Sequence, residues 1–201
     1  IALEYDRELI PVARAELAHA PHVEVREANV LDVDWQSLAD ELGGPLIIYG
    51  NLPYHLSSPI LFALLGSLNA WDRACFMVQK EFAQRLVAQP GQRAAGGLSV
   101  HAALWTHRTM VFQVPPSAFH PPPKVDSAVV ILERRKSPAV DVVDSKVFGQ
   151  LVKALFAQRR KMARKALKPI CEDVPRLLES AAMDGSRRGE NFTLEELARL
   201  A

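Results

Sequence analysis

The first two thirds of the chain alternate short apolar runs with segments in which apolar residues recur every three or four positions. Four of these runs predict buried strands, at residues 1–5, 23–25, 45–49 and 75–78. The segments with helical spacing lie at residues 7–18, 37–42, 59–68 and 81–87. Ser57 or Ser58 would cap the third helix, with Pro59 in its first turn. Strands that alternate with helices predict an α/β fold with a parallel, doubly wound sheet.

The pattern changes after residue 107. Residues 110–114 and 127–132 are rich in β-branched and aromatic side chains, and they flank the prolines at 121–123. Consecutive prolines form neither a helix nor a central strand. We therefore expect a β-hairpin with a long, stiff connection at the edge of the sheet.

The C-terminal part is expected to be helical. One basic helix is predicted over residues 147–167, and two shorter ones near residues 174–182 and 193–200. The polar segment before them contains Pro138 and is typical of a linker. We divide the chain into a sheet domain at residues 1–135, a linker at 136–144 and a helical domain at 145–201.

Composition excludes several classes of protein. Of the 201 residues, 49% are hydrophobic and 23% are charged, which is ordinary for a globular protein. No apolar run is long enough to span a membrane, and the start at Ile1 lacks the basic segment of a signal peptide. Cys75 and Cys171 stand apart, and the histidines are scattered. We expect no metal site, no disulfide and a cytoplasmic location.

The net charge of +1 hides a local concentration of positive charge. Between residues 146 and 171 there is no acidic residue, whereas eight are basic: Lys146, Lys153, Arg159, Arg160, Lys161, Arg164, Lys165 and Lys168. Helical spacing would place Arg160, Arg164 and Lys168 on one face. Such a field favours binding to nucleic acid phosphates over the alternative of a merely solvated helix face.

Glu4 ends the first predicted strand. In dinucleotide-type folds a Gly-rich loop follows strand one, and an acidic residue about 20 positions later binds a ribose hydroxyl. The sequence contains no Gly-rich loop of that kind. We therefore expect the first strand and its loop to lie upstream of Ile1, with Glu4 as the ribose acceptor; the alternative is a solvated carboxylate.

A four-residue motif, Asn51-Leu52-Pro53-Tyr54, directly follows a predicted strand and Gly50. The carboxyl ends of strands are where open α/β sheets bind ligands. Asn, an apolar residue, Pro and an aromatic residue in this order are typical of methyltransferases that act on planar amino groups. The side-chain oxygen of Asn51 and the carbonyl of Leu52 would accept hydrogen bonds from the amino group. Pro53 would stiffen the turn, and stacking on Tyr54 would contribute about 1–3 kcal/mol.

Seven segments in order carry a wider resemblance: LEYDREL, GNLPYHLSSPI, FMVQKEFAQRLVA, GGLSV, VPPSAFHPPPKVDSAVV, LFAQRRKMARKAL and RRGENFTLEELARLA. Across nearly its whole length the chain resembles the bacterial small-subunit rRNA adenine dimethyltransferases. The resemblance implies a Rossmann-like class I methyltransferase domain, N-terminally incomplete, followed by a small all-helical RNA-binding domain. It also implies S-adenosylmethionine as cofactor. The implied substrates are two adjacent adenosines near the 3′ end of 16S rRNA, within the small ribosomal subunit or its precursor.

The resemblance also assigns roles to residues. The base pocket would comprise Asn51, Leu52, Pro53, Tyr54 and Phe119; Phe119 could instead be a core residue of the hairpin. The cofactor would contact Glu4, Tyr5, Asn29, Val30 and Asn51. Asn29 stands where the family usually has Asp, which predicts weaker contact with the cofactor's adenine. RNA would be bound by Arg159, Arg160, Lys161, Arg164, Lys165 and Lys168. Lys124 and Arg85 are further candidates, for which the alternative is a structural ion pair.

Two other functions remain open. Large-subunit rRNA methyltransferases that confer macrolide resistance share the motif, although the segment around residues 114–130 resembles the small-subunit enzymes more. Alternatively, the chain is a catalytically silent rRNA-binding assembly factor, because it lacks the Gly-rich loop. We expect a monomer that binds S-adenosylmethionine poorly in this form.

Overall fold

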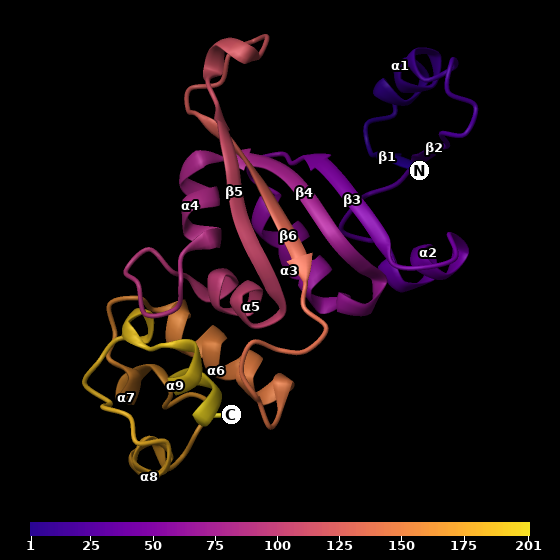
Figure 1. Ribbon diagram of the computed structural model, residues 1–201. Helices are drawn as coiled ribbons and strands as arrows, with labels where there is room; N and C mark the ends of the chain where they lie inside the picture. Colours follow the sequence, from indigo (N-terminus) through magenta and orange to yellow (C-terminus); the bar gives the residue numbers. More distant parts are fainter.

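The computed structural model describes residues 1–201 and consists of three parts in chain order (Figure 1). The first part comprises β1 (Ala2–Glu4), α1 (Leu9–Glu16), β2 (Val25–Glu27) and α2 (Trp35–Glu41). β1 and β2 pair in parallel as a separate two-stranded sheet. The prediction of four N-terminal elements is confirmed, although β2 begins two residues later than expected.

The central sheet has the order β3-β4-β6-β5, from β3 (Leu46–Asn51), β4 (Trp71–Gln79), β5 (Thr106–Val114) and β6 (Ser127–Arg134). β3 is parallel to β4, whereas β6 is antiparallel to both β4 and β5. The predicted hairpin is therefore confirmed. The N-terminal strands pair in parallel as predicted, but they form two separate sheets, because β1 and β3 do not pair.

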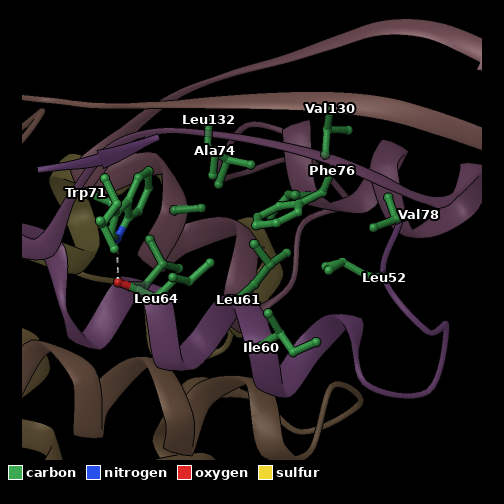
Figure 2. Close-up of a cluster of buried hydrophobic side chains, with 14 of the residues drawn as sticks. Leu52, Ile60, Leu61, Leu64, Trp71, Ala74, Phe76, Val78, Val130 and Leu132 are labelled. Atoms are coloured by element: carbon green, nitrogen blue, oxygen red, sulfur yellow. Dashed lines mark hydrogen bonds between the residues drawn. The ribbon is translucent and has the colours of Figure 1, made fainter. Parts of the chain in front are cut away.

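Helices α3 (Ser57–Gly66), α4 (Lys80–Val87) and α5 (Gly97–Trp105) accompany this sheet. Figure 2 shows the core between α3 and the sheet, where Trp71, Phe76 and Leu61 are each 1% exposed. The indole Nε1 of Trp71 donates to the carbonyl of Leu64 at 2.8 Å, which satisfies the polar atom of the largest core side chain. Helix α5 was not predicted, because its small and apolar residues lack the spacing of an amphipathic helix.

The predicted cap of α3 is wrong. Leu56 occupies the N-cap position, and no side chain caps the helix. Ser57 lies inside the first turn, where its hydroxyl donates to the carbonyl of Pro53 at 3.2 Å. The start of α3 is therefore fixed to the preceding turn rather than capped by serine.

The opposite face of the central sheet is partly open. Ile47 and Tyr49 of β3 are 59% and 74% exposed, whereas Leu46 of the same strand is buried. Alternation along β3 thus separates a packed face from an exposed apolar one.

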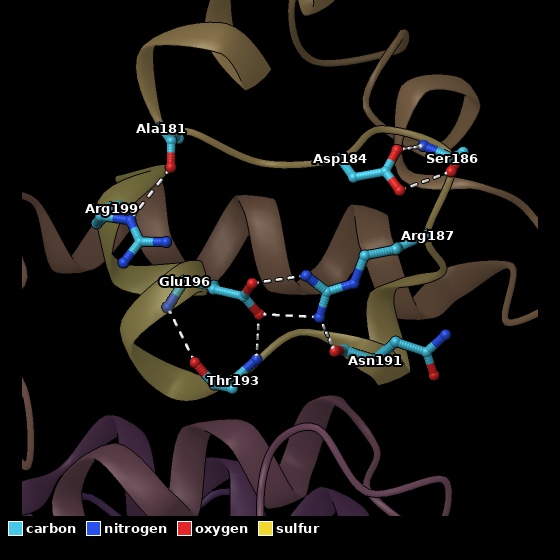
Figure 3. A network of polar contacts seen from close by, with 8 residues as sticks. All are labelled: Ala181, Asp184, Ser186, Arg187, Asn191, Thr193, Glu196 and Arg199. Carbon is cyan, nitrogen blue, oxygen red and sulfur yellow. Dashed lines mark hydrogen bonds and ion pairs between the residues drawn. The ribbon is translucent and has the colours of Figure 1, made fainter.

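The helical part contains α6 (Ser145–Ala157), α7 (Ala163–Ala166), α8 (Val174–Ser180) and α9 (Leu194–Arg199). Short 3-10 turns occupy Leu68–Ala70, Pro116–Ala118 and Gly189–Asn191. A capping box opens α9, where Thr193 and Glu196 exchange hydrogen bonds (Figure 3). Arg187 pairs with the same carboxylate at 2.6 Å, and this hydrogen bond lowers the pKa of Glu196.

The single helix predicted over residues 147–167 is wrong. α6 ends at Ala157, the chain turns, and α7 begins at Ala163. The reason is tertiary: the amides of Ala163 and Arg164 donate to the carbonyls of Arg187 and Gly185, at 2.8 and 3.1 Å. These long-range bonds replace the helical ones that a continuous helix would need at the same amides.

The two main parts share helix α5. Ala102 belongs to the core of the sheet domain, whereas Val100, Ala103 and Leu104 belong to a second core with Phe148 and the other helices of the C-terminal part. The predicted boundary at residue 135 divides the sequence into two domains, but helix α5, which precedes that boundary, packs in the cores of both. No helix combines the length and apolarity needed to cross a membrane.

Candidate functional site

The motif at residues 51–54 begins with the last residue of β3 and continues as a turn. Asn51 is the last residue of β3, opposite Met77 of β4. The amide of Leu52 donates to the carbonyl of Met77 at 3.0 Å, and the amide of Leu56 then donates to the carbonyl of Pro53 at 2.9 Å. The turn is thus held at both ends by the backbone.

Two hydrogen-bond acceptors in this turn remain without partners. The side-chain amide of Asn51 is exposed and makes no hydrogen bond, and no group donates to the carbonyl of Leu52. These are the acceptors that the sequence predicts for an amino group. They stand on adjacent residues of a fixed turn, so they can act on the same ligand.

The core positions the turn from below. The side chain of Leu52 is 7% exposed and packs into the sheet core (Figure 2). A Cβ on Gly50 would lie 3.1 Å from Cδ2 of Leu52 and 3.5 Å from the Phe76 ring. A side chain at Gly50 would therefore press on the group that anchors the motif.

Tyr54 is anchored from across the sheet. Its hydroxyl lies 2.8 Å from the hydroxyl of Ser127, a buried residue at the start of β6. The bond limits rotation of the tyrosine side chain and so fixes where a base could stack. Sequence reasoning missed Ser127, because 73 positions separate the partners and a lone serine carries no signal.

Phe119 follows the 3-10 turn Pro116–Ala118, in the excursion of the β5–β6 hairpin that extends beyond the other strands (Figure 1). Its side chain is partly buried. Phe119 and Tyr54 do not form an aromatic pair, since the pairs in the chain are Phe62–His101 and His101–Phe148. A role for Phe119 in the base pocket stays a prediction.

A cavity of about 870 Å³ opens beside Tyr54, between α3, α4, α5 and α6. Its size is in the range of ligand pockets, and aromatic and basic groups line it. The aromatic side chains are Phe62, Phe82, His101 and Phe156, and the basic ones are Arg85 and Lys153. The guanidinium of Arg85 lies 6.0 Å from the centre of the Phe82 ring. Sequence reasoning missed the aromatic residues because they come from four helices.

His101 belongs to the aromatic wall of this cavity. Its ring meets Phe62 and Phe148 edge-on, with centroids 6.0 and 5.9 Å apart. Burial lowers the pKa of His101, because the charged form loses its hydration. The imidazole is therefore neutral at physiological pH and contributes surface rather than charge.

Glu4 is the last residue of β1, and Asn29 lies two residues after the end of the adjacent strand β2. The amide of Ala28 donates to the carbonyl of Glu4 at 2.9 Å and holds the two strand ends together. Oε1 of Glu4 accepts from the amides of Tyr5 and Asp6, both at 2.7 Å, which leaves Oε2 without a partner. The Tyr5 side chain is exposed beside it.

Asn29 uses its polar atoms locally. Its Oδ1 accepts from the amide of Leu31 at 3.1 Å, and its Nδ2 donates to Asp32 at 2.9 Å. The next residue, Val30, packs against the sheet core. Although residue 29 is an asparagine in this chain, the carboxylate of Asp32 lies beside its side chain. Sequence reasoning missed Asp32, which only the turn brings close.

The basic segment divides into one partnered arginine and a free group. Arg159 pairs with Glu190 at 3.1 Å and donates to the carbonyl of Arg93 at 2.8 Å, so the inference that this segment lacks acidic partners is wrong there. The free group is exposed and has no carboxylate within 4 Å: Arg160, Lys161, Arg164, Lys165 and Lys168. The same holds for Lys124 in the hairpin excursion.

The predicted single helical face of Arg160, Arg164 and Lys168 is also wrong. Arg160 lies in the turn before α7, Arg164 in α7 and Lys168 after it.

A comparison with known proteins places the chain in a family. The family model described as ribosomal RNA adenine dimethylase matches residues 1–195. This chain belongs to that family. The ribosomal RNA small subunit methyltransferase A of Magnetococcus marinus is 47% identical over 200 residues, which cover 100% of this chain and 72% of that protein. A protein of the same name from Xanthomonas campestris is 42% identical over 199 residues, covering 99% of this chain and 74% of that protein.

Solved structures agree on the fold of this dimethylase family member. A dimethyladenosine transferase from Plasmodium falciparum matches with a TM-score of 0.77 at 23% identity, covering 98% of this chain and 78% of that chain. The 23S rRNA methyltransferase ErmE matches with a TM-score of 0.70 at 24% identity, covering 98% and 78%. The expected Rossmann-like α/β fold with added helices is thereby confirmed. The class of rRNA adenine dimethyltransferases is confirmed by the family model and by the two relatives.

Proposed function

We propose that this protein transfers methyl groups from S-adenosylmethionine to the 6-amino groups of two adjacent adenosines near the 3′ end of small-subunit rRNA. The observation that carries the proposal is the pair of unpartnered acceptors on Asn51 and Leu52, beside the anchored ring of Tyr54.

The chemistry of the target explains why two acceptors matter. The lone pair of an adenine amino group is delocalised into the ring, so the nitrogen is a weak nucleophile. Acceptors aimed at its two hydrogens favour a pyramidal nitrogen and direct the lone pair outward. Asn51 and Leu52 do this without reorganisation, because the turn is already fixed. Tyr54 holds the unstacked base by its face.

The cofactor fits the ends of β1 and β2. Oε2 of Glu4 has no partner and suits a ribose hydroxyl, and the exposed ring of Tyr5 suits an adenine face. Asn29, with Asp32 beside it, and Val30 would complete the adenine contacts. When bound, S-adenosylmethionine supplies an activated methyl group. The side chains of the protein then need only bind and orient the reactants.

Two relatives favour small-subunit rRNA over large-subunit rRNA as the substrate. Both are named for the small subunit and are more than 40% identical to this chain over the aligned residues, whereas the likeness to ErmE concerns the fold. The free cations around α7 and Lys124 are suited to rRNA phosphates.

The test supplies the protein with S-adenosylmethionine and either unmethylated small ribosomal subunits or 23S rRNA, and measures dimethyladenosine by mass spectrometry. Transfer to the two adjacent adenosines of the small subunit is expected. Transfer to 23S rRNA alone would favour the large-subunit alternative. Binding to the small subunit without transfer would favour a silent assembly factor, and no binding at all would overturn the proposal.

A further inference from the structure

A second cavity, of about 500 Å³, lies where the start of β5, the segment after β6 and the start of α9 meet. Strands β4 and β5 are both antiparallel to β6, so they run in the same direction. The start of β5 is therefore at the end of the sheet opposite Asn51. This cavity is separate from the one beside Tyr54, and the proposed methyl transfer does not use it.

Two arginines line the cavity, and neither has a carboxylate within 4 Å. Nη1 of Arg108 donates to the carbonyls of Leu86, Ala88 and Ser99 at 3.1, 3.2 and 2.9 Å. Arg108 is thus built into the fold, but its positive charge is not neutralised.

Arg135 differs from Arg108 because its side chain makes no hydrogen bond. The Nε atoms of both arginines are buried without a partner. Of the guanidinium nitrogens of Arg135, only Nε is buried in this way, so its two Nη groups are open donors. A half-buried guanidinium without partners is unusual, because buried polar groups normally find them.

The charges around the cavity reinforce this point. Burial and, as the smaller cause, the positive charge of Arg135 together lower the pKa of Arg108 to about 10. Arg108 therefore remains charged at neutral pH, and the two guanidinium groups repel each other. Glu195 is the one carboxylate of the lining; it is exposed and pairs with neither arginine. His107, also in the lining, is exposed.

We propose that this cavity binds a phosphate group through the open Nη donors of Arg135, in the positive field of Arg108. A guanidinium fork matches the geometry of two phosphate oxygens, and the exposed hydroxyls of Thr109 and Thr193 in the lining are further donors. Bound phosphate would also relieve the repulsion between the arginines. The phosphate belongs either to the backbone of an RNA or to a free phosphate ion, and these share the same chemistry.

The test compares Arg135→Gln with Lys136→Gln. Lys136 is the adjacent residue, is exposed and has no ion pair, so its replacement removes the same charge without touching the cavity. Circular dichroism checks that both variants fold. The first measurement titrates inorganic phosphate and follows the amide signals of His107 and Thr109 by NMR. The second measures the affinity for small-subunit rRNA against salt concentration.

With either source, phosphate is expected to shift these signals in the unmodified protein and in Lys136→Gln, but not in Arg135→Gln. If the source is RNA, the slope of log affinity against log salt also falls by about 1 for Arg135→Gln relative to Lys136→Gln. If Arg135→Gln loses the phosphate-induced NMR shifts but keeps the slope of log affinity against log salt, the ligand is a free phosphate ion. Phosphate shifts that are equal in both variants, or absent from the unmodified protein, overturn the proposal. The phosphate titration needs no methyl transfer, so its failure is distinct from failure of the proposed function.

Discussion

The turn at residues 51–54 and the basic segment at residues 158–168 carry the two halves of the proposed activity, and they are built differently. The first is held by a backbone bond from Leu52 to Met77 of the neighbouring strand, by one bond within the turn and by the buried side chain of Leu52. The second is shaped by bonds to residues more than 20 positions away, at 185–190. The difference is in the support: the proposed catalytic turn is anchored to a neighbouring strand and to the sheet core, whereas the basic segment is fixed by bonds to the loop between α8 and α9.

The strongest way to break this comparison is Asn51→Ala. Removing one of two preorganised groups from a reacting centre costs on the order of 100-fold in rate. The fold should be unaffected, because the Asn51 side chain makes no hydrogen bond. Asn69→Ala, at another exposed asparagine, serves as the control. Single-turnover methyl transfer and thermal unfolding measure both effects, and a variant with full activity would remove Asn51 from the site.

For the basic segment, the second prediction concerns a contact beside it and is measured as the stability of the protein rather than as a rate. A Cβ on Gly189 would lie 2.9 Å from both Cβ and the carbonyl oxygen of Leu155, near the end of α6. Gly189→Ala should therefore destabilise the protein by about 1–3 kcal/mol through overpacking. Gly44→Ala, where no atom lies within 4 Å, is the matched control. Urea unfolding that is equal in the two variants would contradict the tight contact.

Ser127→Ala sharpens the account of the turn. Losing the hydrogen bond to Tyr54 should cost about 1 kcal/mol, which is roughly a five-fold loss of rate. If Ser127 positions the ring, the loss falls on kcat with KM for the RNA nearly constant. A purely structural role would lower the unfolding temperature and leave kcat of the folded protein unchanged. Ser137→Ala, at an exposed position, provides the comparison.

The smallest expected effects distinguish the unpaired cations of the basic segment from the paired Arg159. Lys165→Gln should lower the salt dependence of RNA binding by about one unit of slope, because Lys165 is exposed and unpaired. Arg159→Gln should change that slope less and reduce stability instead, since Arg159 joins Glu190 to the carbonyl of Arg93. Equal slopes for the two variants would show that pairing does not matter here.

The sequence by itself determined the order of strands and helices up to residue 87, the hairpin around the prolines and the motif at Asn51. These features depend on periodicity and on residues next to each other in the chain, so local physics suffices to predict them. The free acceptors of Asn51 and Leu52 follow from the same short turn.

Only the tertiary structure decided the rest. Ser127 meets Tyr54 and Glu190 meets Arg159 only through folding, because 73 and 31 positions separate these partners in the sequence. The break after Ala157 has the same origin, because amides near Ala163 bond to the segment around Arg187 instead of continuing a helix. Helical propensity is weak for each residue, so a few long-range hydrogen bonds and a packed core override it.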